Sequence, residues 1–113
     1  NIIINNLGKI KFIDMRGKLG DEYSILGDKF YDWAKLYQSI IGYDKILLGK
    51  KISLKYEKEM IDFFEAAILE FMTPEDLQNI KLITKSLLFS LIPLHNDLGK
   101  CQKYFNLINE IRF

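Results

Sequence analysis

The chain has 113 residues, of which 49% are hydrophobic and 27% charged, a composition that excludes a disordered protein and suits one globular domain. Its 16 basic residues nearly balance 15 acidic ones and form no block, which argues against nucleic acid as a main partner. No apolar run approaches the roughly 20 residues of a membrane span, and no signal peptide is visible. The single cysteine, Cys101, cannot form an internal disulfide, so we expect a reducing compartment and a cytoplasmic location.

A β-hairpin is predicted at the start of the chain. Residues Asn1–Ile4 form an apolar strand, Asn5–Gly8 supplies turn residues that tolerate positive φ, and Lys9–Asp14 returns as the second strand. A two-stranded hairpin alone is only marginally stable in water. We therefore expect it to pack against helices or against sheet that this chain lacks.

Asp14, at the end of the second strand, is the first candidate site residue. A carboxylate that ends a buried strand is a common metal ligand, and its hard oxygen atoms suit Mg²⁺. A single acid in this place can equally be a strand-end or turn residue without chemistry. Met15–Gly27 is predicted to be a loop, in which Arg16 either pairs with Asp14 or a phosphate or is an exposed cation.

A helix is predicted to begin after Asp28, whose carboxylate suits the N-cap position, and to end at Gly42. Two apolar stripes at helical spacing predict that this helix is buried on two sides. The first stripe comprises Phe30, Trp33, Ala34, Tyr37 and Ile41, and the second Leu36 and Ile40. Asp32 would then be buried and would need hydrogen-bond partners. We interpret the aromatic residues as core rather than as a cofactor site.

These residues carry a family resemblance. Ile13-Asp14, followed by Gly27-Asp28-Lys29-Phe30-Tyr31-Asp32-Trp33-Ala34, resembles the metal-binding segment and following helix of kinase-like small-molecule phosphotransferases. That broad family includes aminoglycoside phosphotransferases and choline kinases, and it usually has Leu at the position of Trp33. The sequence looks most like bacterial phosphotransferases of capsule or surface-polysaccharide clusters, which have Pro in place of Met15. The motif covers about a third of the chain.

The resemblance implies roles for the candidate residues. Asn1 matches the Asn that follows the family's catalytic loop, so Asn1 and Asp14 would hold Mg²⁺ against the phosphates of ATP; otherwise Asn1 is a disordered terminus. Asp32 would brace the catalytic loop, with Asp28 also supporting the site. The family's Gly-rich loop, strand Lys and His-Gly-Asp segment are absent from the sequence. Because these segments are absent, we expect the catalytic base and the adenine-binding lobe to lie outside this sequence. The chain starts with Asn rather than Met, so we expect residues before Asn1 to supply them.

A short basic connector and a helix are predicted next. The connector, Tyr43–Ser53, is interpreted as a solvated face because it contains three lysines, Lys45, Lys50 and Lys51. The helix runs from about Lys55 to Met72, with apolar residues repeating at helical spacing.

A further helix is predicted to start at Thr73, with Thr73 as N-cap, Pro74 at the first helical position and acids in the first turn. It continues to about Ser90. Its later part, Leu82–Leu91, is apolar nearly all round, so we expect that part to lie deep in the core.

Pro93 ends that pattern, and a polar loop, Leu94–Asp97, leads to a last helix over Leu98–Phe113. The loop contains the only histidine, His95, which is either an acid–base or ligand residue or a structural one. The last helix is predicted to bury one face, formed by Cys101, Phe105 and Ile108 with Tyr104 and Ile111 beside it. Cys101 has no second thiol or imidazole at a helpful spacing and is interpreted as a core residue.

We therefore predict an α+β, mainly helical fold: a metal-site hairpin over residues 1–14 and a helical subdomain of about four helices over 28–113. The resemblance implies part of the carboxyl-terminal lobe of a kinase-like fold. It would belong to an ATP- and Mg²⁺-dependent phosphotransferase acting on a small hydroxylated acceptor such as a sugar. Its partners would be the rest of that enzyme and the acceptor, and self-association is a further expectation. The alternative is a non-catalytic helical interaction module derived from such a lobe.

Overall fold

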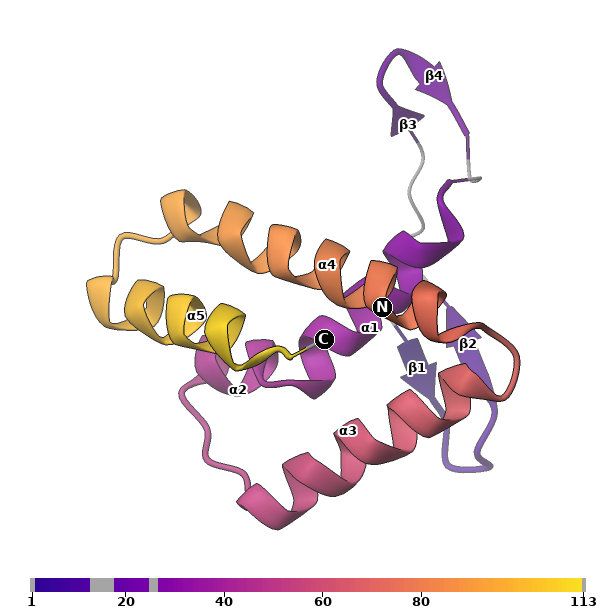
Figure 1. Ribbon diagram of the computed structural model, residues 1–113, viewed down its shortest axis with the longest axis horizontal. Coiled ribbons are helices and arrows are strands. Elements are labelled where there is room, and N and C mark those ends of the chain that lie inside the picture. Colours follow the sequence, from indigo (N-terminus) through magenta and orange to yellow (C-terminus); the bar gives the residue numbers. More distant parts are fainter. Residues whose placement is uncertain (1, 13–17, 25–26, 113) are drawn as a thin grey trace.

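The computed structural model describes residues 2–12, 18–24 and 27–112. Four short strands precede five α-helices: β1 (Ile2–Ile4), β2 (Ile10–Phe12), β3 (Lys18–Leu19) and β4 (Glu22–Tyr23). The helices are α1 (Lys29–Ile40), α2 (Tyr43–Leu48), α3 (Leu54–Leu69), α4 (Pro74–Leu91) and α5 (Leu98–Glu110), with a 3₁₀ turn, η1 (Ile92–Leu94), after α4 (Figure 1). The predicted α+β, mainly helical class is confirmed, with five described α-helices where about four were expected.

β1 and β2 form the predicted antiparallel hairpin, with Ile2 opposite Phe12. Asn5 shapes the turn, because its side-chain Oδ1 accepts hydrogen bonds from the backbone N–H groups of Leu7 and Lys9, each at 2.9 Å. The apolar strand residues are exposed on both faces of this hairpin, and Phe12 keeps 69% of its surface in contact with solvent. The hairpin is therefore held mainly by its own ladder and turn.

A second hairpin, β3–β4, lies within the segment that was predicted to be a loop, so that prediction is wrong for residues 18–23. Gly20 turns the chain with a φ of 61°, a left-handed conformation that glycine adopts without strain. Figure 1 shows this hairpin projecting away from the helices. With two residues per strand, it has too little periodic pattern to be visible in the sequence.

The core lies where α1 and α4 cross and where α3 and α5 pack against them. Eleven apolar side chains are buried there: Ala34, Tyr37, Ile41, Phe64, Ile68, Leu77, Ile80, Leu88, Tyr104, Leu107 and Ile111. Thr84 of α4 joins the two central helices, because its hydroxyl donates to the Ile80 carbonyl at 2.8 Å and lies 3.2 Å from the Ala34 carbonyl oxygen of α1. Burial of this set is the main driving force for assembly of the helices.

The aromatic stripe of α1 belongs to this core, as predicted. The Tyr37 ring stacks on Phe64 of α3 with centroids 5.1 Å apart, and the Trp33 ring lies 5.5 Å from that of Phe71. The predicted burial of α1 on two sides is wrong at Leu36, which is exposed, whereas Ile40 of the same stripe is half-buried against the core. One face of α1 meets the other helices and the opposite face meets solvent.

The burial predictions for α4 and α5 are also wrong in part, because each helix buries only one of its apolar faces. The end of α4 does not lie deep: Leu82 and Phe89 are exposed, and only the stripe that carries Leu88 is buried. In α5 the buried face is centred on Tyr104, whereas Phe105 is 47% exposed. Both α4 and α5 contain more apolar residues than their single contact face with the other helices can bury. The apolar residues alone therefore did not identify which face is buried.

Helix α2 replaces most of the predicted basic connector. Gly42 precedes it with a φ of 127°, and a Cβ there would lie 3.3 Å from Cε of Lys45. The chain leaves α1 near Gly42, as predicted, and the positive φ at this position accounts for the glycine. Every helix in the described part of the chain is too short or too polar to cross a lipid bilayer.

Candidate functional site

The predicted metal ligands, Asn1 and Asp14, lie outside the described residues, and so does Arg16. The last described residue before Asp14 is Phe12, at the end of β2. Within residues 2–12, 18–24 and 27–112, no group of three or more His, Cys, Asp or Glu side chains is arranged to hold a metal ion. The metal site therefore stays a prediction.

Asp28 has the predicted capping role. Its Oδ1 accepts a hydrogen bond of 2.7 Å from the backbone N–H of Phe30, which satisfies one of the free donors at the start of α1. The carboxylate also lies at the positive end of the helix dipole, where a negative charge is favourable. Asp28 thus fixes the place where the chain enters α1.

Asp32 is exposed, so its predicted burial is wrong. Asp32 is two positions before Ala34, the most buried residue of α1, and two positions are about 200° apart around an α-helix. Its side chain therefore points away from α4. The prediction failed because it assumed that both apolar stripes of α1 were buried.

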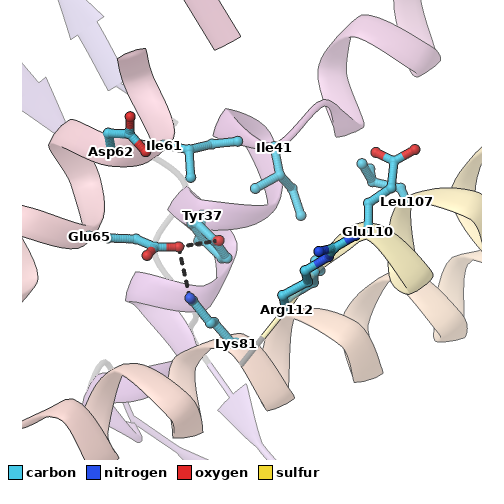
Figure 2. A pocket seen from close by; sticks show the side chains of 10 residues that line it. Tyr37, Ile41, Ile61, Asp62, Glu65, Lys81, Leu107, Glu110 and Arg112 are labelled. Carbon is cyan, nitrogen blue, oxygen red and sulfur yellow. Dashed lines mark hydrogen bonds and ion pairs between the residues drawn. The ribbon is translucent and has the colours of Figure 1, made fainter. Parts of the chain in front are cut away.

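The structure brings together a polar triad that the sequence did not predict: Tyr37 of α1, Glu65 of α3 and Lys81 of α4 (Figure 2). Oε1 of Glu65 accepts from the Tyr37 hydroxyl at 2.8 Å and from Nζ of Lys81 at 2.9 Å. The Lys81 side chain is only 8% exposed and that of Glu65 28%. A lysine with so little contact with water requires a carboxylate partner, and Glu65 supplies it.

The same contacts set the protonation state of the tyrosine. Burial raises the pKa of Tyr37, and the hydrogen bond to Glu65 and its negative charge raise it further. Tyr37 therefore stays a neutral hydrogen-bond donor at neutral pH and cannot act as a general base there. The triad is suited to holding α1, α3 and α4 together and to binding polar groups.

A cavity of about 360 Å³ opens beside the triad, between α1, α3, α4 and the end of α5. Its apolar wall includes Ile41, Ile61 and Leu107, and its polar wall adds Asp62, Glu110 and Arg112 to the triad (Figure 2). This mixture of both charge signs and aliphatic surface has no single preference for cations or anions. It does not by itself indicate one ligand.

His95 and Cys101 are both half-buried and belong to the packing near the start of α5. The His95 ring lies 5.2 Å from the ring of Tyr104. The Cys101 thiol donates to the backbone carbonyls of Ile92 and His95 at 3.4 and 3.5 Å. These contacts support a structural role for each residue.

Lys81 had a signal in the sequence that the prediction missed. It lies four residues after Leu77 and seven before Leu88, on the stripe that α4 buries. A charged residue in register with a buried stripe indicates a paired interior charge. Its partner could not be inferred in the same way, because Glu65 and Tyr37 come from separate helices.

Comparisons with protein-family models, with curated proteins and with the solved structures find no match to this chain. The functional argument therefore depends on the chain's own residues and geometry.

Proposed function

We propose that this chain is part of an ATP-dependent phosphotransferase that moves a phosphoryl group to a small hydroxylated acceptor, a sugar or sugar-like molecule, in capsule or surface-polysaccharide synthesis. The observation that carries the proposal is the motif together with the described elements beside it. In the sequence, Ile13-Asp14 follows Phe12, the last residue of β2, and Asp28 caps α1. A strand before the first half of the motif and a helix after the second are what the resemblance implies, which supports the proposal.

The chain's own residues would have the following roles. Asp14 and Asn1 offer hard oxygen ligands of the kind that Mg²⁺ prefers, and Arg16 would pair with Asp14 or with a phosphate. When bound, Mg²⁺ offsets charge on the nucleotide phosphates. The base that orients the acceptor hydroxyl would be supplied by residues outside this chain, because the family's His-Gly-Asp segment is absent from the sequence.

The polar triad supports this assignment through α1. Asp28, the second acid of the motif, caps the start of α1, and Tyr37 further along α1 is hydrogen-bonded to Glu65 and, through it, linked to Lys81. Phosphoryl transfer depends on precise positioning of the metal and phosphates. A helix fixed to two neighbouring helices by hydrogen bonds is a suitable support for such a site.

The exposed hairpin is consistent with a larger enzyme. Ile2, Ile4 and Phe12 are all more than half exposed, although they are the residues that a hairpin usually buries. In a phosphotransferase lobe this hairpin would pack against the part that binds the nucleotide.

The test uses the protein that contains this chain together with the segment preceding Asn1. We expect acceptor-dependent ADP release with ATP and Mg²⁺, and a loss of about a hundredfold or more in Asp14→Ala, because a metal ligand would be removed. Asp21→Ala is the matched control, since Asp21 is an exposed acid in the β3–β4 turn. Near-wild-type turnover in Asp14→Ala would show that the metal assignment is wrong.

A helical interaction module is the second candidate, favoured by large apolar side chains exposed on the helices. Phe63 of α3, Phe71 after it and Phe89 of α4 are each more than half exposed. Exposed aromatic residues in such number are typical of contact surfaces. The presence of a His-Gly-Asp segment five residues before Asn1 would favour the enzyme, and its absence the interaction module.

A further inference from the structure

A basic hollow lies between α2, the segment that follows it, and α5. It shares Leu107 and Glu110 with the cavity beside the triad, but none of the three triad residues lines it. Its volume is about 460 Å³, which is within the range of small-molecule sites. Four lysines line it, Lys45, Lys50, Lys51 and Lys103, together with a single carboxylate, Glu110. The chain as a whole has a net charge of only +1, so positive charge is concentrated here.

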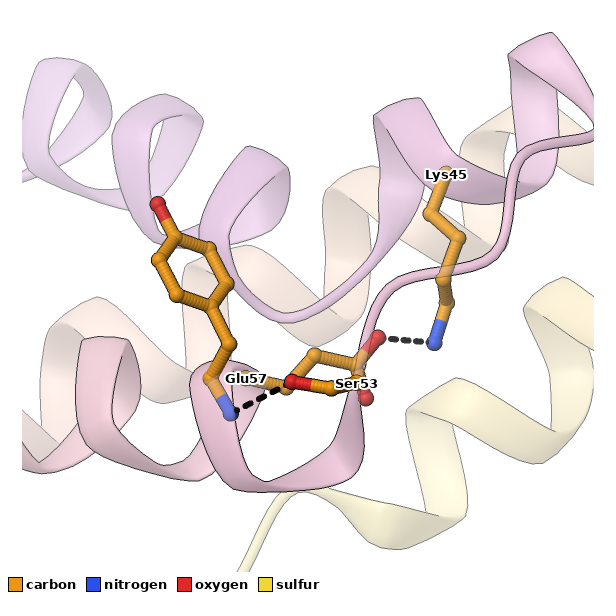
Figure 3. Close-up of polar contacts among 4 residues, drawn as sticks. Lys45, Ser53 and Glu57 are labelled. Carbon is orange, nitrogen blue, oxygen red and sulfur yellow. Dashed lines mark hydrogen bonds and ion pairs between the residues drawn. The ribbon is translucent and has the colours of Figure 1, made fainter.

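One of the four lysines is already neutralised. Lys45 of α2 forms an ion pair with Glu57 in the first turn of α3, where Ser53 caps the helix by accepting from the backbone N–H of Tyr56 (Figure 3). That ion pair is largely shielded from solvent and ties α2 to α3. Lys45 is therefore part of the wall of the hollow rather than a free binding group.

The opposite wall is fixed as well. Nζ of Lys100 on α5 donates to the backbone carbonyl of Leu47 at 3.2 Å, which connects α5 to the last turn of α2. A cation in this place is favourable because the carboxyl end of a helix carries partial negative charge. The hollow is thus bounded by helices that side-chain contacts hold in position.

Lys50, Lys51 and Lys103 are exposed, and the described residues give none of them an ion-pair partner. They approach the hollow from two sides, Lys50 and Lys51 from the segment after α2 and Lys103 from α5. Like charges gathered around a concave surface reinforce one another's potential and attract anions. Ile46, Ile52 and Leu107 add apolar surface that would contact an uncharged part of a ligand.

We infer that this hollow binds a soluble small molecule carrying two or more phosphate groups. Three unpaired lysines on two walls match a ligand with more than one anionic group, and a cavity of this volume has room for it. A flat membrane surface would not enter a concave site, and a nucleic acid would need a longer basic track than these residues form. This inference does not depend on the proposed metal site at Asp14.

The experiment titrates residues 1–113 with tripolyphosphate in a buffer containing EDTA, and follows binding by calorimetry and backbone amide NMR. Excluding divalent cations separates this site from any metal–nucleotide site. We expect saturable binding that weakens with added NaCl, with the largest shifts at Gly49, Lys50, Lys51 and Lys103. Lys50→Gln/Lys103→Gln should weaken binding about tenfold or more, since two of three unpaired charges are removed.

Lys9→Gln/Lys11→Gln is the matched control, because it removes the same charge from the exposed β1–β2 hairpin. It should leave the affinity within about twofold, and thermal melts should show both double variants folded. Equal losses in the two variants would mean diffuse attraction and would overturn the inference, as would the absence of saturable binding. Tighter binding to phosphatidylglycerol vesicles or to single-stranded RNA than to tripolyphosphate would also overturn it.

Discussion

One oxygen atom of Glu65 accepts hydrogen bonds from both Tyr37 and Lys81. The two donors contribute unequally to stability, because Lys81 is charged and Tyr37 is neutral. Removing the Lys81 ammonium leaves a partly buried carboxylate with only a neutral partner. Removing the Tyr37 hydroxyl leaves the ion pair intact. The cost of losing a buried charge partner exceeds the cost of losing a neutral hydrogen bond.

Lys81→Met should lower the free energy of unfolding by about 2 kcal/mol, and Tyr37→Phe by about 1 kcal/mol, measured by urea denaturation. Tyr104→Phe is the control, because the buried Tyr104 hydroxyl has no hydrogen-bond partner among the described residues. It should be neutral or stabilising. A Tyr37→Phe variant as stable as Tyr104→Phe would contradict the importance of the triad.

The tyrosine hydroxyl also predicts a pH dependence. The pKa of Tyr37 is raised on folding, so the folded state holds its proton more tightly than the unfolded state. The stability from this linkage is fully present below the ordinary tyrosine pKa of about 10 and is lost as pH rises above it. Stability measured between about pH 9 and 11 should fall less steeply in Tyr37→Phe than in the wild type. Parallel slopes would contradict the prediction.

Two acids four residues apart, Asp28 at the N-cap of α1 and Asp32 within the helix, differ in what they contribute. Asp28 accepts from a backbone N–H, whereas Asp32 faces solvent. Loss of an N-cap side chain usually costs about 1 kcal/mol, whereas exposed substitutions usually stay within about 0.5 kcal/mol. Position in the helix, rather than chemical type, sets the contribution of each carboxylate.

Asp28→Ala should therefore lower the free energy of unfolding by about 1 kcal/mol and Asp32→Ala by less than about 0.5 kcal/mol, measured by thermal and urea unfolding of residues 1–113. A larger loss in Asp32→Ala than in Asp28→Ala would show that Asp32 makes an important contact.

The features predicted well from sequence are those fixed by neighbouring residues. The Asn5 turn and the Asp28 cap depend on contacts within a few residues, and so does the capping box in which Thr73 and Asp76 exchange hydrogen bonds of 3.0 and 3.1 Å. The choice of buried face in α4 and α5 depends on distant helices, so Leu82 and Phe105 were placed wrongly. The triad likewise depends on distant segments, because its three residues come from α1, α3 and α4.

The β1–β2 hairpin leaves several large apolar side chains open to solvent. Ile4 is 64% and Ile10 60% exposed, in addition to Phe12. Apolar surface of this kind tends to be covered by another protein surface. In the proposed enzyme the rest of the protein would cover it, whereas residues 1–113 alone leave it open to a second copy.

Residues 1–113 alone should therefore self-associate with increasing concentration, as measured by sedimentation velocity. Ile4→Thr/Phe12→Thr should shift the population toward monomer, because threonine keeps β propensity but removes apolar area. Leu82→Thr/Phe89→Thr, on the exposed side of α4, is the comparison variant. If it has the larger effect, the associating surface is on the helices instead.

The contact between Thr84 and the Ala34 carbonyl spans 50 positions in the sequence. Bringing such distant segments together costs more chain entropy than pairing neighbours such as α4 and α5, so α1 should dock late in folding. During synthesis, the apolar face of α1 cannot be covered by α4 until all of α4 has left the ribosome. Nascent chains that end before Leu91 would thus present that face to chaperones.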